Sequence, residues 1–252
     1  MTAMTAMTSI HDEAPMHLDP KRALRAMVAL TKNPDDTSQV FAIIESLSGH
    51  APARVLRGFR DEAHGRRLLA ERPNIVSILS DRDALRRMPT GSLAHAYLAF
   101  TESEGITADG LVASSEAGLT GVRADGTDLD YIGDRMRDTH DLWHTVTGYK
   151  GDLIGEASLL GFTLSQTANP GIGMIVLTGM LRIRQLGAIG MIAGGIRRGA
   201  KSRWLPALDW ESLLPLPIET VRSLLDIEVV PAYEPLRTRD LRAEGLLEPV
   251  AA

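Results

Sequence analysis

The side chains that could do chemistry are concentrated in one short stretch of this chain. His140, Asp141 and His144 are followed, after eleven further residues, by Glu156, in a sequence with only seven histidines. If residues 129–148 form a helix, His140 and His144 share one face at positions i and i+4. Asp141 then lies about 100° around that helix. Glu156 would come from the next element.

Imidazole nitrogens and carboxylate oxygens in this pattern suit Zn²⁺ or another divalent ion such as Fe²⁺. The absence of cysteine excludes a thiolate site. The residues alone leave three interpretations open. The first is a divalent ion with positions left for water or substrate. The second is a helical, metal-dependent HD-type phosphohydrolase, for which His95 could supply the extra upstream histidine although nothing marks its distant aspartate. The third is a solvated helix face without an ion.

The flanking sequence adds a resemblance. The run Tyr131–Pro170, with its His-Asp-x-x-His-x11-Glu pattern, resembles the coenzyme Q (ubiquinone) biosynthesis family named as the fourth of the Coq proteins. ERPNIVSI and RMPTGSLAHAYLAFTESEGI upstream, and LPALDWESLLPLPIETVRSLLDI downstream, also look like that family, so roughly residues 20–235 are covered. The resemblance implies four metal ligands, of which Asp141 and Glu156 would also be catalytic: His140, Asp141, His144 and Glu156.

The resemblance also implies a reaction. It is the metal-dependent oxidative decarboxylation at ring carbon C1 of a polyprenylated intermediate derived from 4-hydroxybenzoate. A cation beside the phenol oxygen would stabilise negative charge on the ring. Zinc accepts no electrons, so an oxidative step needs dioxygen, the electron-rich ring or a different metal. The alternative is a non-catalytic, lipid-binding scaffold that organises the biosynthetic complex around a structural metal.

Three charged residues precede His140 by about one helical turn and could orient the ligands through hydrogen bonds. An equally open interpretation is that they form a solvated face. They are Asp134, Arg135 and Asp138.

Helical periodicity dominates the rest of the chain. The best strand candidate is residues 75–79. Because one isolated strand cannot form a sheet, we expect a helix or a packed loop there. The expected helices begin at Pro20, after Asp35 or Asp36, at Ala53 (one broken helix to Leu69), at Arg82, after Thr90 or Ser92, at residues 129 and 151, and at Pro217. The sequence therefore predicts an all-α, single multi-helix domain with a metal site between two adjacent helices and an apolar lipid groove. Its expected parts are a disordered tail 1–18, the domain 19–235 and a tail 236–252.

A glycine-rich basic segment follows the histidine motif. Residues 157–208 carry six basic and no acidic side chains. Their apolar runs are shorter than the ~20 residues that span a bilayer. Gly190–Gly194 and Gly195–Gly199 are small-xxx-small pairs, typical of a tightly packed helix or of a groove for an isoprenoid tail, although an ordinary core helix is possible too. The predicted lipid-site residues are Met174, Met180, Arg182, Gly187, Gly190, Met191 and Gly194.

Charge and the N-terminal residues predict partners and location. Uncompensated basic residues favour a membrane surface, and the net charge of −5 argues against nucleic acid. The expected partners are a polyprenylated aromatic quinone precursor, the membrane surface, other ubiquinone-biosynthesis enzymes and a second copy of the chain. No basic residue precedes Lys21, so neither a secretory signal nor a mitochondrial presequence is predicted. The expected location is the bacterial cytoplasm, peripheral at the inner membrane.

Overall fold

The computed structural model describes residues 16–107, 115–116, 126–182 and 188–245. In these ranges every regular element is a helix, and backbone pairing of the β type is limited to an isolated bridge between Ser92 and Pro217. The prediction of an all-α domain is therefore confirmed. Residues 1–15 of the expected disordered tail 1–18 and the lipid-site candidate Gly187 lie outside the described residues.

The first helices follow the capping and breaking signals of the sequence. Asp19 accepts a hydrogen bond from the Arg22 amide at 2.9 Å, and Pro20 occupies the first helical position. The helix expected from Ala53 is interrupted at Glu62, as predicted. The helices are α2 (Pro20–Lys32), α3 (Thr37–Ser46), α4 (Ala51–Asp61) and α5 (Ala63–Glu71).

The next three helices lead to one wall of the histidine motif. The segment 75–79 is helical, and Asn74 caps it by accepting a hydrogen bond from the Ser77 amide at 3.2 Å. Ser92 caps α8 in the same way, and Gly105, with φ of +68°, ends it. These helices are α6 (Ile75–Ser80), α7 (Arg82–Arg86) and α8 (Leu93–Glu104).

The histidine motif lies on two helices where one was predicted. The expectation of a continuous helix over 129–148 is wrong, because α10 (Asp128–Asp138) ends at Thr139 and α11 (His140–Thr147) begins after it. The Thr139 hydroxyl and the Thr139 amide both donate to the Arg135 carbonyl, at 2.8 and 3.0 Å. Threonine hydroxyls that bond back in this way bend helices. Both histidines still share α11, so their i, i+4 relation holds.

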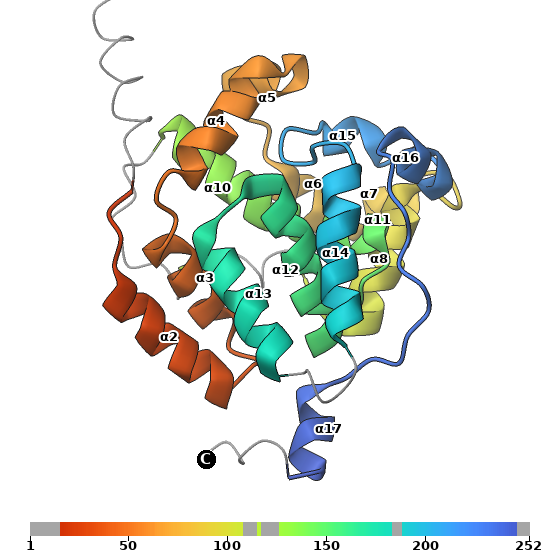
Figure 1. Ribbon diagram of the computed structural model, residues 1–252. Coiled ribbons are helices and arrows are strands. Elements are labelled where there is room, and N and C mark those ends of the chain that lie inside the picture. Colours follow the sequence, from red (N-terminus) through yellow and green to blue (C-terminus); the bar gives the residue numbers. More distant parts are fainter. Residues whose placement is uncertain (1–15, 108–114, 117–125, 183–187, 246–252) are drawn as a thin grey trace, which may run out of the picture.

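The second half of the chain packs around α12, which lies in the middle of the molecule (Figure 1). An irregular segment, residues 226–237, runs from α16 to α17 along the outside of the bundle, and we call it the C-terminal strap. The first residues of the predicted C-terminal tail thus belong to the strap and to α17. The helices are α12 (Leu153–Thr167), α13 (Pro170–Arg182), α14 (Ile189–Lys201), α15 (Trp210–Leu213), α16 (Ile218–Leu224) and α17 (Thr238–Ala243).

Close contact between α12 and α14 explains two of the glycines in the basic segment. A Cβ atom at Gly195 would lie 2.1 Å from the Ser158 carbonyl oxygen, and one at Gly199 would lie 2.5 Å from the Phe162 carbonyl oxygen. Any side chain there would force the helices apart. The tightly packed helix expected for this small-xxx-small pair is therefore α12 of the same chain.

The largest hydrophobic cluster joins α8, α11, α12 and α16 around Trp143, Phe162 and Trp210, all at most 2% exposed. This cluster holds α11 and α12 against each other through their buried side chains. Among the described residues, no helix has both the length and the apolar character needed to cross a bilayer.

Candidate metal centre

Three donor side chains meet where α11 faces the first turn of α12. The Nε2 atoms of His140 and His144 are 3.2 Å apart. Glu156 places one carboxylate oxygen 3.2 Å from His144 Nε2 and the other 3.5 Å from His140 Nε2. One ligand atom from each of the three residues lies within 4.8 Å of the others. The spacing that singled out these residues in the sequence thus corresponds to one cluster in space.

The turn between α11 and α12 sets this geometry. Gly148, with φ of +82°, ends α11 in a conformation that side chains disfavour. Asp152 begins α12 by accepting a hydrogen bond from the Ile154 amide at 3.0 Å. Glu156 lies one turn later and therefore points back toward the histidines.

His144 is held on two sides. Its side chain is only 1% exposed, and the Phe100 ring stacks on it with centroids 5.1 Å apart and planes 16° from parallel. Its Nδ1 atom lies 3.0 Å from the Tyr149 carbonyl oxygen. A carbonyl can only accept, so Nδ1 carries the proton and Nε2 directs its lone pair toward Glu156 in the neutral ring.

The imidazoles and the carboxylate of this cluster shift one another's pKa values toward the charged forms. Burial lowers the pKa of His144, but the Glu156 carboxylate outweighs it and leaves that pKa raised. Loss of hydration raises the pKa of Glu156, and the two imidazoles more than reverse it, so its pKa falls well below the usual range. In the ion-free protein a proton can therefore occupy the position that suits a divalent cation.

Asp141 is a buried carboxylate beside this cluster but is not among the three converging donors. It is 5% exposed, and burial raises the pKa of its carboxyl above the usual value, although His140 and His144 lower it in part. Its role as a fourth ligand stays a prediction.

The donor set fits a divalent ion. Two imidazole Nε2 atoms at 3.2 Å cannot face each other as lone pairs without a proton or a cation between them. Two nitrogens and a carboxylate are a combination that zinc and iron accept. His140 and Glu156 are 26% and 44% exposed, so solvent reaches one side of the cluster.

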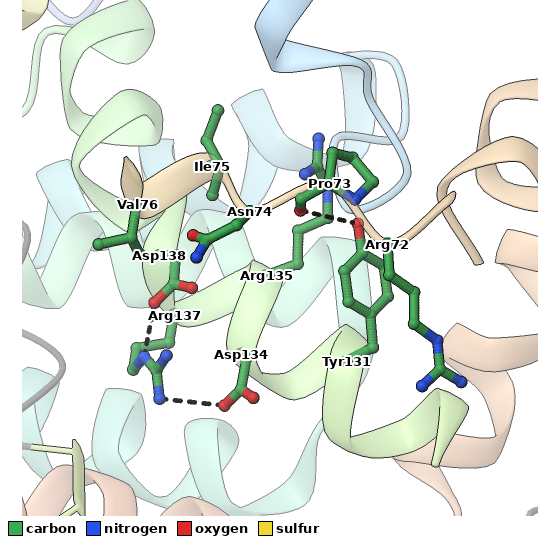
Figure 2. Close-up of a pocket in the computed structure, with 10 residues that line it drawn as sticks. All are labelled: Arg72, Pro73, Asn74, Ile75, Val76, Tyr131, Asp134, Arg135, Arg137 and Asp138. Atoms are coloured by element: carbon green, nitrogen blue, oxygen red, sulfur yellow. Dashed lines mark hydrogen bonds and ion pairs between the residues drawn. The ribbon is translucent and has the colours of Figure 1, made fainter. Parts of the chain in front are cut away.

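The three charged residues that precede His140 line a different feature, a cavity of about 360 Å³ between α6 and α10. Figure 2 shows Arg137 joining Asp134 and Asp138, with distances of 3.0 and 2.7 Å. Arg135 is 2% exposed and donates to both oxygens of Glu211, at 2.9 and 2.7 Å. These ion pairs do not involve the histidines.

The other predicted site residues lie outside the donor cluster. His95 Nε2 lies 3.1 Å from the Arg86 carbonyl oxygen and is not in the donor cluster, so His95 does not supply the extra histidine of the phosphohydrolase interpretation. Met174, Met180 and Met191 pack against three different hydrophobic clusters.

The remaining lipid-site candidates differ in their surroundings. A Cβ at Gly190 would meet nothing within 4 Å, and one at Gly194 would lie 2.7 Å from the Arg198 guanidinium. Arg182 is exposed and donates to the Thr31 carbonyl at 3.1 Å. The lipid site stays a prediction.

Similarity to known proteins extends over most of the chain. The family described as "Coenzyme Q (ubiquinone) biosynthesis protein Coq4" matches residues 20–231. The chain is 29% identical over 214 residues to the mitochondrial ubiquinone biosynthesis protein COQ4 homolog of Danio rerio, covering 83% of this chain and 76% of that protein. It is 28% identical over 211 residues to the mitochondrial ubiquinone biosynthesis protein COQ4 of Clavispora lusitaniae, covering 81% of this chain and 64% of that protein.

The fold also matches a crystal structure. A candidate ubiquinone biosynthesis protein of Nostoc punctiforme PCC 73102 superposes with a TM-score of 0.59, covering 82% of this chain and 98% of that one. Its sequence is 22% identical, so this likeness concerns the fold alone.

Proposed function

The chain belongs to the family of coenzyme Q (ubiquinone) biosynthesis proteins named Coq4, and on that premise we propose that it catalyses the oxidative decarboxylation at ring carbon C1 of a polyprenylated, 4-hydroxybenzoate-derived intermediate. The observation that carries the proposal is the cluster of His140, His144 and Glu156 with one solvent-exposed side. A bound Zn²⁺ or Fe²⁺ would supply Lewis-acid stabilisation of negative charge on the ring oxygen.

The protein's own residues have distinct roles in this proposal. His140 and His144 would present nitrogen donors from α11, and the half-exposed Glu156 would present a carboxylate from α12, with the solvent-facing side of the cluster left open to water or substrate. Asp141 is buried beside the cluster, where its carboxyl would be placed to pass a proton to the ring or to an oxygen product.

The oxidant in this proposal is dioxygen. With water, it converts the ring carboxylic acid into a ring hydroxyl, carbon dioxide and hydrogen peroxide, so that the two electrons lost by the ring reduce the dioxygen. The scaffold alternative, with a structural metal, calls for a closed site, and the exposure of Glu156 favours the enzyme instead.

The reaction is tested in cells that depend on this protein for ubiquinone. Glu156→Gln should reduce ubiquinone to background and accumulate a prenylated intermediate that still bears its ring carboxylate, detected by lipid mass spectrometry. Glu71→Gln, a change at an exposed glutamate on α5, should leave ubiquinone normal. An accumulating intermediate that has lost the carboxylate and gained the C1 hydroxyl would move the block to a later step and reject the proposal.

A membrane-surface partner is the second part of the proposal. Leu177 and Leu181 on α13 are 59% and 65% exposed, and Arg182 follows them. Two of the six basic side chains of residues 157–208 are less available to a lipid surface than the sequence implies. Arg198 is 7% exposed and donates to the Tyr149 hydroxyl, and Arg197 pairs with Glu228. The end of α13 is thus the better candidate for contact with lipid. The location at a bacterial inner membrane stays a prediction.

Liposome sedimentation checks this surface. A buried leucine side chain contributes about 1.5–3 kcal/mol, so Leu177→Gln/Leu181→Gln should weaken binding to anionic vesicles at least about tenfold. High salt should weaken binding only in part, because screening affects Arg182 and not the leucines. Leu224→Gln, at a 45% exposed leucine on α16, is the matched control. Equal binding by the wild type and the double variant would assign the exposed leucines to another partner.

A further inference from the structure

One peptide unit in the turn after α11 is held from both sides. Its carbonyl, on Tyr149, accepts the hydrogen bond from His144 Nδ1 at 3.0 Å. Its amide, on Lys150, donates to the Tyr233 hydroxyl oxygen at 3.0 Å. The carbonyl and amide of a planar trans peptide point in opposite directions, so fixing the amide also fixes the direction of the carbonyl.

The Tyr233 hydroxyl is itself anchored. It donates to one carboxylate oxygen of Asp152 at 2.6 Å. The other oxygen of Asp152 accepts from the Ile154 and Leu236 amides, both at 3.0 Å. Asp152 is 2% exposed, and this set of bonds ties the start of α12 to the C-terminal strap. Burial and the Asp152 carboxylate raise the pKa of Tyr233, which keeps the donated proton on the hydroxyl.

The turn needs such an anchor. Gly148 and Gly151 flank the peptide, and glycine gives a backbone more freedom than any other residue. The Tyr149 side chain is buried and receives a bond from Arg198 at 3.1 Å, which holds the ring but leaves the orientation of the following peptide open. The Lys150 side chain is exposed. Its ammonium group lies over the Tyr233 ring, 5.5 Å from the centroid, so that contact also depends on Tyr233. The Tyr233 hydroxyl is the group that bonds the peptide amide directly.

We propose that Tyr233 and Asp152 are positioning residues for His144, which set its tautomer and ring orientation through the 149–150 peptide. The neutral imidazole has two tautomers, and a ligand nitrogen must be unprotonated. A fixed Tyr149 carbonyl selects the tautomer with the proton on Nδ1, and so leaves Nε2 free to bind an ion beside Glu156. Loss of a ligand's direct hydrogen-bond partner commonly lowers metal affinity by about 10- to 100-fold, and residues that act through that partner should have an effect up to this size. The consequence for affinity rests on the proposed function, whereas the tautomer itself does not.

Tyr233→Phe tests the inference, because it deletes one oxygen and keeps the ring. In metal-free protein labelled with ¹⁵N-histidine at pH 8.5, the wild-type His144 signals should report protonated Nδ1 and unprotonated Nε2, with assignment by His144→Gln. The variant should show a mixture of tautomers, and its affinity for Zn²⁺ should fall in a competition titration, by no more than the about 10- to 100-fold that loss of a ligand's direct partner causes. Far-UV circular dichroism should be unchanged.

Tyr131→Phe is the matched control, since its hydroxyl lies 3.5 Å from the Pro73 carbonyl and has no connection to His144. An unchanged His144 spectrum in Tyr233→Phe would overturn the inference, as would an equal shift in Tyr131→Phe. If the wild type binds no Zn²⁺ while the tautomer still changes in Tyr233→Phe, the positioning role stands and the proposed metal function fails. The two ideas are thus tested separately.

Discussion

His144→Ala should remove the divalent ion that the purified wild-type protein is expected to carry at close to one per chain. His144 supplies the buried member of the donor set, and its loss leaves His140 and Glu156 without the nitrogen that lies 3.2 Å from each of them. The loss of affinity should exceed the ~100-fold typical of removing a mere hydrogen-bond partner of a ligand. Elemental analysis of purified protein, followed by Zn²⁺ titration, measures both quantities.

Lowering the pH should also weaken binding of the divalent ion by the wild-type protein, though less than His144→Ala does. The pKa of His144 is raised in the ion-free protein, so protons compete for Nε2 at a higher pH than they would for a free imidazole. Affinity for Zn²⁺ should therefore fall steadily as the pH is lowered from 8 to 5.5. His95→Ala, which removes a histidine bonded to the Arg86 carbonyl, should keep the ion. Stoichiometric metal in both His140→Ala and His144→Ala proteins would contradict the assignment.

Glu211→Ala should be among the most destabilising single substitutions outside the centre. It leaves the Arg135 guanidinium, 1% exposed, without the carboxylate that accepts two of its hydrogen bonds. Removing one partner of a buried ion pair costs about 3–5 kcal/mol. Urea denaturation followed by circular dichroism gives the free energy of unfolding directly.

A second glutamate–arginine pair provides the control. Glu219 bonds Arg222 at 2.6 Å but is 76% exposed, and exposed pairs contribute about 0–1 kcal/mol. Glu219→Ala should therefore change the free energy of unfolding little. Similar losses in the two variants would show that burial of Arg135 does not govern its contribution.

Sequence spacing was sufficient to predict that His140 and His144 are neighbours, because residues at i and i+4 of a helix lie on one face whatever surrounds them. It does not place Glu156, which lies on the next helix and meets the histidines only because of the turn between α11 and α12. The same local logic predicted the caps at Asp19 and Ser92. It failed at Thr139, where the helix break depends on a hydroxyl that bonds back to Arg135, and threonine also occurs inside helices.

Contacts between distant segments could not be predicted from spacing. Nothing near His144 in the sequence points to Tyr233 or to the stacked Phe100 ring. Gly195 and Gly199 were recognised as a close-packing pair, but the segment they contact, α12, required the structure. Such contacts depend on how distant helices pack against one another, and local residue spacing does not reveal that packing.

The position of the C-terminal strap in the sequence means that the metal centre can be completed only late in synthesis of the chain. Tyr233 lies 81 residues after Asp152, and a ribosome that adds 5–20 residues per second makes that interval in roughly 4–16 s. Until then the nascent chain has its donors but lacks the anchor on the turn between them. An ion captured early should exchange freely, and durable loading should be a late event in biosynthesis, completed when the strap docks.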